Sequence, residues 1–219
     1  LNLTVGESDI PEYVSHMHYT KSFKTLIMGT ETGVFGRLDV QAEVINYEED
    51  EEEQNKQKEK KAIEVPFVEL GRFHTKRVNG IKELGDSSQL ITISEDHYMS
   101  LWEATTQKLL STVYQPATPT SLEVSTDGSA AFVGTIIGAF RAYDLTNRQR
   151  PRLVMQCRFF EEDVPINCIS TSTDGKYILV SSNEKNIVYI LSGNPQERYT
   201  IYGFIEFEGV VLNAAFHTD

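Results

Sequence analysis

Residues 89–104 read QLITISEDHYMSLWEA, and this stretch decides the fold. The apolar segment QLITIS runs into the polar residues EDH, and the second segment YMSLWE follows at once. Apolar side chains alternate with others in the second segment, and turn-forming residues separate the two. This is the pattern of a β-hairpin, so the stretch predicts two short antiparallel strands.

Three further segments repeat this order of strand, turn and strand. They read KTLIMGTETGVFGRLDV (24–40), STDGSAAFVGTIIGAFRAYDL (125–145) and STDGKYILVSSNEKNIVYIL (172–191). Strong helical periodicity appears nowhere in the chain. Gly, Ser, Thr, Asn and Asp gather between the apolar runs, as turns between strands require. The sequence therefore predicts an all-β fold built from repeated hairpins.

The spacing between the repeats defines the size of one unit. Each unit has a turn residue sixteen positions before a second-strand residue; the pairs are Ser22 and Leu38, Asp86 and Trp102, Asp127 and Tyr143, and Asp174 and Ile190. Successive turn residues lie 64, 41 and 47 positions apart. The first interval is too long, and the excess falls on a charged insert at 42–62. Without that insert, every interval lies near the roughly 40–45 residues of a four-stranded propeller blade.

The unit at 73–115 contains motifs with a distinctive spacing. A histidine follows Phe73 at the start of the unit, a Ser-x-Asp turn comes next, and a Trp-Glu pair begins six residues after the aspartate. The residues are His74, Ser94, Asp96 and Trp102. They resemble the motifs of the WD-repeat (WD40) family of β-propellers, whose blades open with Gly-His and close with Trp-Asp. The resemblance implies a WD40-type β-propeller.

In that family, the histidine, serine and aspartate form a buried hydrogen-bond chain that ends on the tryptophan indole N–H. The resemblance implies that His74, Ser94, Asp96 and Trp102 form such a structural network, which is stable only when every member has a partner. We expect this structural role rather than a catalytic Ser-His-Asp set. The other units depart from the motif, because their turn-aspartate position holds Thr32, Ile137 and Glu184.

The number of units predicts an incomplete ring. Four blades span about 13–71, 73–115, 117–160 and 164–208, and residues 209–219 resemble the opening strand of a fifth. Propellers close with about 4–8 blades, and an unclosed array exposes strand edges and a sheet face. We therefore expect residues 1–219 to contribute four blades to a seven- or eight-bladed ring, with the remainder of the propeller coming from the same full-length protein. A compact four-bladed ring is the alternative.

The charged insert includes residues 46–61, in which an acidic run precedes a lysine-rich one. The acidic residues are Glu48, Glu49, Asp50, Glu51, Glu52 and Glu53. By register, the insert joins the third and fourth strands of the first blade, where an added loop costs little entropy. A block of this composition is typical of a solvated, disordered loop. The alternatives are a docking arm for a basic partner, such as a tubulin- or dynein-associated protein, and a helical extension.

Composition excludes several function classes. The chain of 219 residues has 20 Lys and Arg against 32 Asp and Glu, a net charge of −12, which argues against binding of a nucleic-acid backbone. A local cluster at Arg148, Arg150, Arg152 and Arg158 is expected to pair with Asp144 and the acidic residues at 161–163. No apolar run is long enough to span a bilayer, so no membrane association is expected.

Motifs for catalysis and for cofactors are also lacking. The sequence contains neither a G-x-S-x-G elbow nor a Gly-rich phosphate-binding loop. Its two cysteines cannot form a disulfide framework or a four-ligand zinc site. His16 and His18 share one face of a strand, but no Cys or carboxylate stands at ligand spacing nearby. We expect no enzymatic activity, no cofactor and no metal.

These observations favour a non-enzymatic scaffold that binds other proteins. Degenerate blades with a charged insert are similar to large WD-repeat proteins of cilia and flagella. That resemblance implies a cytoplasmic, cytoskeletal protein of the axoneme that anchors or regulates dynein on microtubules, with dynein-associated proteins or tubulin as partners. The alternatives are a WD-repeat assembly factor in ribosome biogenesis or another large intracellular complex, and a propeller hydrolase.

Overall fold

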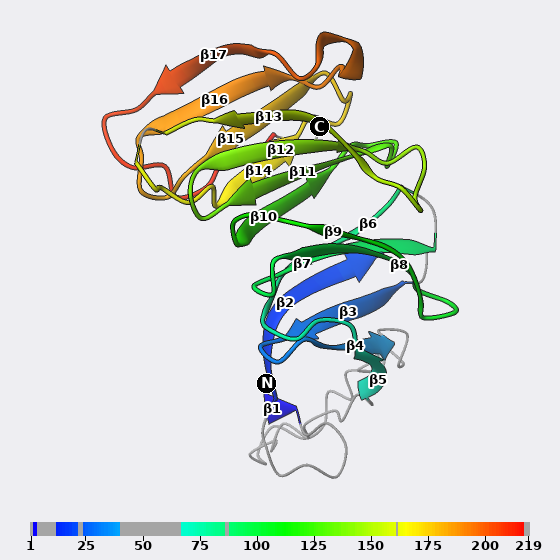
Figure 1. Ribbon diagram of the computed structural model, residues 1–219. Helices are drawn as coiled ribbons and strands as arrows, with labels where there is room; N and C mark the ends of the chain where they lie inside the picture. Colours follow the sequence, from blue (N-terminus) through cyan, green and yellow to red (C-terminus); the bar gives the residue numbers. More distant parts are fainter. Residues whose placement is uncertain are drawn as a thin grey trace, which may run out of the picture.

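The chain folds as strands almost throughout (Figure 1). The computed structural model describes residues 2–3, 12–21, 24–39, 67–85, 88–160 and 162–216. Within these ranges, one 3₁₀ turn, η1 (Pro195–Glu197), is the only helical element. The described part of the chain has no helix long and apolar enough to cross a membrane. The prediction of an all-β fold is confirmed.

The strands form four separate antiparallel sheets that follow one another along the sequence. The first consists of β1 (Asn2–Leu3), β2 (Glu12–Thr20), β3 (Thr25–Thr30), β4 (Val34–Asp39) and β5 (Phe67–Arg72). The second consists of β6 (Val78–Glu83), β7 (Gln89–Ser94), β8 (Tyr98–Glu103) and β9 (Lys108–Tyr114). The third consists of β10 (Pro119–Val124), β11 (Ala130–Thr135), β12 (Ala139–Asp144) and β13 (Arg152–Arg158). The fourth consists of β14 (Cys168–Thr171), β15 (Tyr177–Ser181), β16 (Ile187–Ser192) and β17 (Ile201–Glu206).

Each sheet repeats the same four-stranded meander, and its strands share a common irregularity. The register shifts by one residue between the third and outermost strands of every sheet, a β-bulge that increases the local twist. The shifts lie at Phe35/Gly36, Leu101/Trp102, Ala142/Tyr143 and Ile190/Leu191. The first sheet carries β1 as an extra short strand beside β2. Four blade-like sheets with one internal geometry are therefore present.

The sheets pack face to face in sequence order, from the first near the N-terminus to the fourth at the other end of the array (Figure 1). Their first full-length strands, β2, β6, β10 and β14, are neighbours in space, and we call them the inner strands. Side chains of one inner strand hydrogen-bond to the backbone that enters the next. Ser15 Oγ donates to the carbonyl of Val78 at 2.8 Å, and Ser121 Oγ donates to that of Ile166 at 2.8 Å.

Most of the apolar core lies between neighbouring sheets, and a small cluster around Met28 and Val34 belongs to the first sheet alone. One cluster joins the first and second sheets, around Phe35 and Ile81. A larger one joins the second and third sheets, and the largest joins the third and fourth, where Phe132 packs against both Phe140 and Tyr199. Each sheet is thus stabilised mainly by its neighbours, as in other repeat proteins.

The predicted opening strand of a fifth unit is not a strand. Residues 207–216 carry no strand pairing, although their backbone donates two hydrogen bonds to the fourth sheet, from Phe207 to Asn186 and from Val211 to Lys185. The inner strands β6, β10 and β14 each pair antiparallel with the second strand of their own sheet. Residues 207–216 have no such second strand to supply backbone hydrogen bonds, so they do not form a strand.

Candidate functional site

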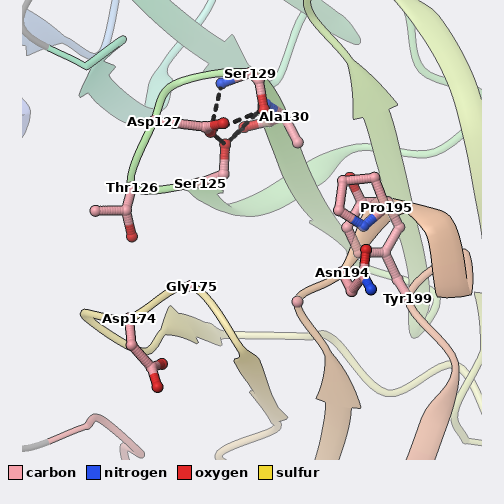
Figure 2. Close-up of a pocket in the computed structure, with 11 residues that line it drawn as sticks. Ser125, Thr126, Asp127, Ser129, Ala130, Asp174, Gly175, Asn194, Pro195 and Tyr199 are labelled. Carbon is pink, nitrogen blue, oxygen red and sulfur yellow. Dashed lines mark hydrogen bonds between the residues drawn. The ribbon is translucent and has the colours of Figure 1, made fainter.

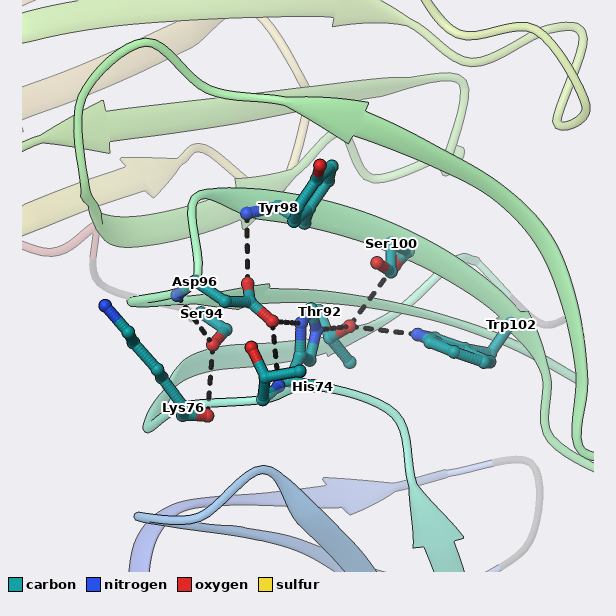
Figure 3. Close-up of polar contacts among 9 residues, drawn as sticks. His74, Lys76, Thr92, Ser94, Asp96, Tyr98, Ser100 and Trp102 are labelled. Atoms are coloured by element: carbon teal, nitrogen blue, oxygen red, sulfur yellow. Dashed lines mark hydrogen bonds and ion pairs between the residues drawn. The ribbon is translucent and has the colours of Figure 1, made fainter.

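The predicted network residues meet where the first sheet passes into the second (Figure 3). His74 follows β5 and is only 3% exposed, Asp96 lies in the tight turn between β7 and β8, and Trp102 lies on β8. His74 Nδ1 is 2.9 Å from Asp96 Oδ2. The indole of Trp102 stacks on Phe73, with 4.1 Å between ring centroids. Histidine, aspartate and tryptophan therefore lie together at one blade junction.

The link between histidine and tryptophan is Thr92, not Ser94 (Figure 3). Trp102 Nε1 donates to Thr92 Oγ1 at 3.0 Å, and His74 Nε2 lies 2.8 Å from the same oxygen. Ser94 instead donates to the Lys76 carbonyl and accepts from the Asp96 backbone, so it supports the turn. The sequence held a signal for this, because Thr92 is two residues from Ser94 on one strand face. Thr92 pairs across the strands with Ser100, and Trp102 is two residues from Ser100, so Thr92 lies diagonally beside Trp102.

Hydrogen bonds keep the network aspartate ionised. Burial raises the pKa of Asp96, but hydrogen bonds from the His74 ring and from the Thr75 and Tyr98 backbone outweigh burial and lower it to about 2. The Thr92 hydroxyl accepts from Trp102 and can donate to His74, which leaves each polar side chain of the group with a partner. Buried, partnered side chains thus connect the end of the first sheet to the second, the arrangement expected of a structural network.

Replacing Thr92 with valine is expected to lower the free energy of unfolding by about 2 kcal/mol. Valine keeps the shape but leaves the buried nitrogens of His74 and Trp102 without their shared hydrogen-bond partner. Thr92→Ser, which restores the hydroxyl, is the matched control and should recover more than half of the loss. Urea denaturation measures all three proteins. A larger loss in Ser94→Ala than in Thr92→Val would contradict this assignment.

A second site lies where the inner strands end. A pocket of about 290 Å³ is lined by the ends of all four inner strands and the turns that follow them, and we call it the axial pocket. Its lining includes His18, Lys82, Glu123 and Thr171, one residue from each inner strand. Lys82 Nζ lies 2.8 Å from Glu123 Oε2 in a partly buried ion pair. The axial pocket is therefore polar, and all four sheets build it.

The axial pocket holds a histidine that stays neutral. The Glu83 backbone N–H donates to His18 Nε2 at 3.3 Å, so that nitrogen carries no proton. Burial, and next the Lys82 ammonium, lower the pKa of His18 to about 4, and burial likewise lowers that of His16. An imidazole with this pKa is a weak base, so the pocket is better suited to binding polar groups than to transferring protons.

Sequence reasoning missed the axial pocket, although a signal was present. His18, Lys82 and Glu123 each lie four positions before the turn residue that defines their unit. Positions that are equivalent in neighbouring units come close together where the inner strands pack. The opposite charges of Lys82 and Glu123, in the second and third units, therefore indicate an ion pair.

The neutral histidine predicts a pH dependence of stability. The pKa of His18 falls from its ordinary 6.5 to about 4 on folding, so the unfolded chain binds the proton first as pH falls. Between pH 6.5 and 4 the free energy of unfolding should therefore decrease, with His18 contributing about 1–2 kcal/mol because solvent screens a half-buried group.

In His18→Gln, which can still accept the Glu83 N–H, that decrease should be smaller by this amount. Urea denaturation at several pH values across the range measures both slopes. Equal slopes for the two proteins would contradict the prediction.

A pocket of about 300 Å³ lies between two equivalent turns and the loop around η1 (Figure 2). Asp127 and Asp174 line it, yet each carboxylate is bound within its own turn: Asp127 by Ser125 and Ser129, Asp174 by Ser172 and the Lys176 backbone. Hydrogen bonds lower the pKa of Asp174 to about 2. The described residues contain no group of three His, Cys, Asp or Glu side chains placed to hold a metal.

The arginine cluster on the third sheet contacts nearby carboxylates and the backbone. Arg152 pairs with Asp144 at 3.0 Å, Arg158 pairs with Asp163, and Arg148 donates to the Gly128 carbonyl. The two ion pairs agree with the expected salt-bridged blade edge, whereas Arg148 binds a backbone carbonyl. The acidic residues Glu48 to Glu53 lie outside the described residues, between β4 and β5.

The fold and the sites define an all-β protein of consecutive blade-type sheets whose inner strands end at a shared polar pocket. No family model matches the sequence, and no curated protein matches it either.

Proposed function

We propose that this chain is part of a WD40-type β-propeller of seven or eight blades that acts as a non-enzymatic scaffold for other proteins. The observation that carries the proposal is the repetition of one blade-like sheet four times, with every inner strand contributing to one axial pocket. A set of rigid sheets held by interlocking cores presents its turns in fixed positions, and fixed turns suit protein recognition.

The chemistry of the two sites supports binding over catalysis. The buried network leaves no reactive group open to a substrate, and Lys82 of the axial pocket is paired with Glu123. The neutral His18 accepts a backbone N–H. Groups that are already paired or held neutral are poor general acids or bases, which supports binding over proton transfer at these two sites.

The proposed setting is the axoneme of cilia or flagella, where the scaffold anchors or regulates dynein on microtubules. The resemblance of the unit at 73–115 to WD repeats and the charged insert between β4 and β5 support this proposal. The acidic residues Glu48 to Glu53 would supply negative charge for a basic partner.

Affinity purification with mass spectrometry from native cells tests the proposal. The bait is the tagged natural protein, and the matched control lacks residues 46–61. Recovery of dynein-associated proteins or tubulin supports the axonemal scaffold, and their loss on deletion assigns docking to the insert. Recovery of pre-ribosomal factors instead would overturn the axonemal setting in favour of ribosome assembly.

A further inference from the structure

The pocket between two equivalent turns and the loop around η1, which we call the turn pocket, combines acidic and apolar side chains. Its volume is about 300 Å³, and the turns at 125–129 and 174–175 and the loop at 193–199 surround it (Figure 2). Asp127 and Asp174 line it together with Ala130 and Pro195. Lys and Arg are absent from the described residues that line it. Such a lining suits a ligand that carries a positive group on an apolar stem.

Asp127 has a carboxylate oxygen that its own turn does not use. The Ser125 hydroxyl, the Ser129 hydroxyl and the Ser129 N–H all donate to Oδ1, at 2.6, 2.8 and 2.9 Å, and none of them donates to Oδ2. Burial raises the pKa of Asp127, but these hydrogen bonds outweigh burial and lower it, so the carboxylate is ionised at neutral pH. Asp174 differs, because Lys176 Nζ lies 3.1 Å from its Oδ2. Asp127 is therefore the carboxylate with an oxygen left for a ligand.

Tyr199 brings a second polar group to the turn pocket. The residue is only 1% exposed, and its ring packs edge-on against Phe132 with 5.1 Å between centroids. Burial, and next the Asp144 and Asp127 carboxylates, raise the pKa of Tyr199 to about 12, so its hydroxyl keeps its proton. Within the described part of the chain, this hydroxyl takes part in no hydrogen bond. A polar group so deeply buried normally has a partner, and Tyr199 lines the pocket in which a ligand would supply one.

The backbone holds the walls of the turn pocket in place. Arg198 and Tyr199 both have positive φ, 51° and 56°, a conformation that residues other than glycine seldom adopt. The Gly193 N–H donates to the Lys176 carbonyl at 2.7 Å, and a Cβ on Gly193 would collide with the Gly175 carbonyl. The loop that carries Tyr199 is thus fixed against the neighbouring turn. A ligand would find the polar groups already in position, which reduces the cost of binding.

The one arginine that acts on Asp127 is engaged elsewhere in the described structure. Burial lowers the pKa of Arg148, and the Asp127 carboxylate partly offsets this effect. Arg148 Nη1 nevertheless donates to the Gly128 carbonyl at 2.6 Å, and Arg148 does not line the turn pocket. The described residues therefore do not fill the pocket with a cation of their own.

We propose that the turn pocket binds the guanidinium group of an arginine. Asp127 Oδ2 and the Tyr199 hydroxyl are acceptors from the third and fourth sheets, and a guanidinium has five N–H donors in one plane with which to reach both. An ammonium is a compact point charge and matches two separate acceptors less well. Ala130 and Pro195 offer apolar contact to the methylene stem. This binding site is separate from the acidic insert and does not depend on the proposed scaffold function.

Nuclear magnetic resonance titration of the ¹⁵N-labelled chain 1–219 tests the proposal. The amides of Gly175 and Gly193 line the pocket and report on binding. Nα-acetyl-L-arginine methylamide represents an arginine within a protein and should shift both signals saturably, with a Kd on the order of 1 mM. The citrulline analogue has nearly the same shape without the charge and should bind at least about tenfold more weakly. Equal affinity for these two probes, or tighter binding of the lysine analogue, would overturn the proposal.

A parallel titration with free L-arginine identifies the source of the group. Tighter binding of the capped probe assigns the ligand to an arginine of another protein, and tighter binding of free L-arginine assigns it to the amino acid. Both results support a guanidinium site. No saturable shift with either probe would mean that the turn pocket is not such a site.

Two variants connect the affinity to the named groups. Asp127→Asn keeps Oδ1 as the acceptor for its turn but removes the charge, and it should weaken binding at least about tenfold. Tyr199→Phe keeps the ring against Phe132 and should weaken binding about threefold or more. Asp163→Asn and Tyr177→Phe make the same chemical changes outside the pocket and should leave the Kd unchanged. If Asp127→Asn does not fold, Tyr199→Phe decides. Unchanged affinity in the folded pocket variants would refute the assignment.

Discussion

Replacing Trp102 with alanine is expected to lower the free energy of unfolding by about 3–5 kcal/mol, the range for truncating a buried tryptophan. Trp102 is 7% exposed, stacks on Phe73 and donates to Thr92. Its loss removes packing between the first and second sheets and leaves Thr92 with one partner fewer. Urea denaturation of the purified chain, followed by circular dichroism, measures the change.

Two controls separate the contributions of the indole. Trp102→Phe keeps the stacked ring but not the N–H, so it should cost only about 1–2 kcal/mol. Tyr114→Ala truncates an aromatic side chain that is 59% exposed on β9 and should change stability by less than about 1 kcal/mol. A cost for Trp102→Ala that is no larger than that for Tyr114→Ala would show that the junction does not depend on Trp102.

Gly134→Val is expected to disrupt the packing between the third and fourth sheets. It should lower the free energy of unfolding by about 3 kcal/mol or more. A Cβ at position 134 would lie 2.6 Å from Ile166 Cγ2 and would also meet the Ser121 hydroxyl, closer than atoms can approach. The added methyl groups cannot be accommodated without moving the start of the fourth sheet, and overpacking of this kind destabilises a core. The Ser121 to Ile166 hydrogen bond would be lost as well.

Hydrogen exchange locates the damage. Amides of β14 to β16 should exchange faster in Gly134→Val, whereas those of β7 and β8 should keep their protection. Gly203→Val is the matched control, because a Cβ there would meet no atom within 4 Å. Uniform loss of protection across all four sheets would mean that the array unfolds as one unit rather than from the fourth sheet.

The sequence predicted the four sheets well because strand periodicity and turn residues are local properties. Hairpins at 24–40, 89–104, 125–145 and 172–191 match consecutive strand pairs of the structure. The unit length followed from turn spacing alone. By contrast, residues 209–216 look like a strand in sequence but form none, since a strand also needs a partner that supplies its hydrogen bonds.

The candidate sites were only partly predictable for a related reason. His74, Asp96 and Trp102 came from their spacing, but the acceptor Thr92 depends on which cross-strand neighbour lies diagonally beside the indole. The axial pocket depends on the packing of four different sheets, so Lys82 and Glu123 meet although 41 positions separate them. Patterns within one unit do not reveal contacts between units.

The chain passes directly from the outermost strand of one sheet to the inner strand of the next, and this order has a consequence for synthesis on the ribosome. A sheet is complete when its outermost strand has emerged, but its apolar face stays bare until the following unit of about 45 residues has been made. At about 5–20 residues per second, that delay is on the order of 2–9 s for every sheet in turn. During its synthesis, a chain of this design therefore always exposes the apolar face of the most recently completed sheet close to the ribosome. Chaperones can bind this face, and its position shifts to the next sheet as the chain grows.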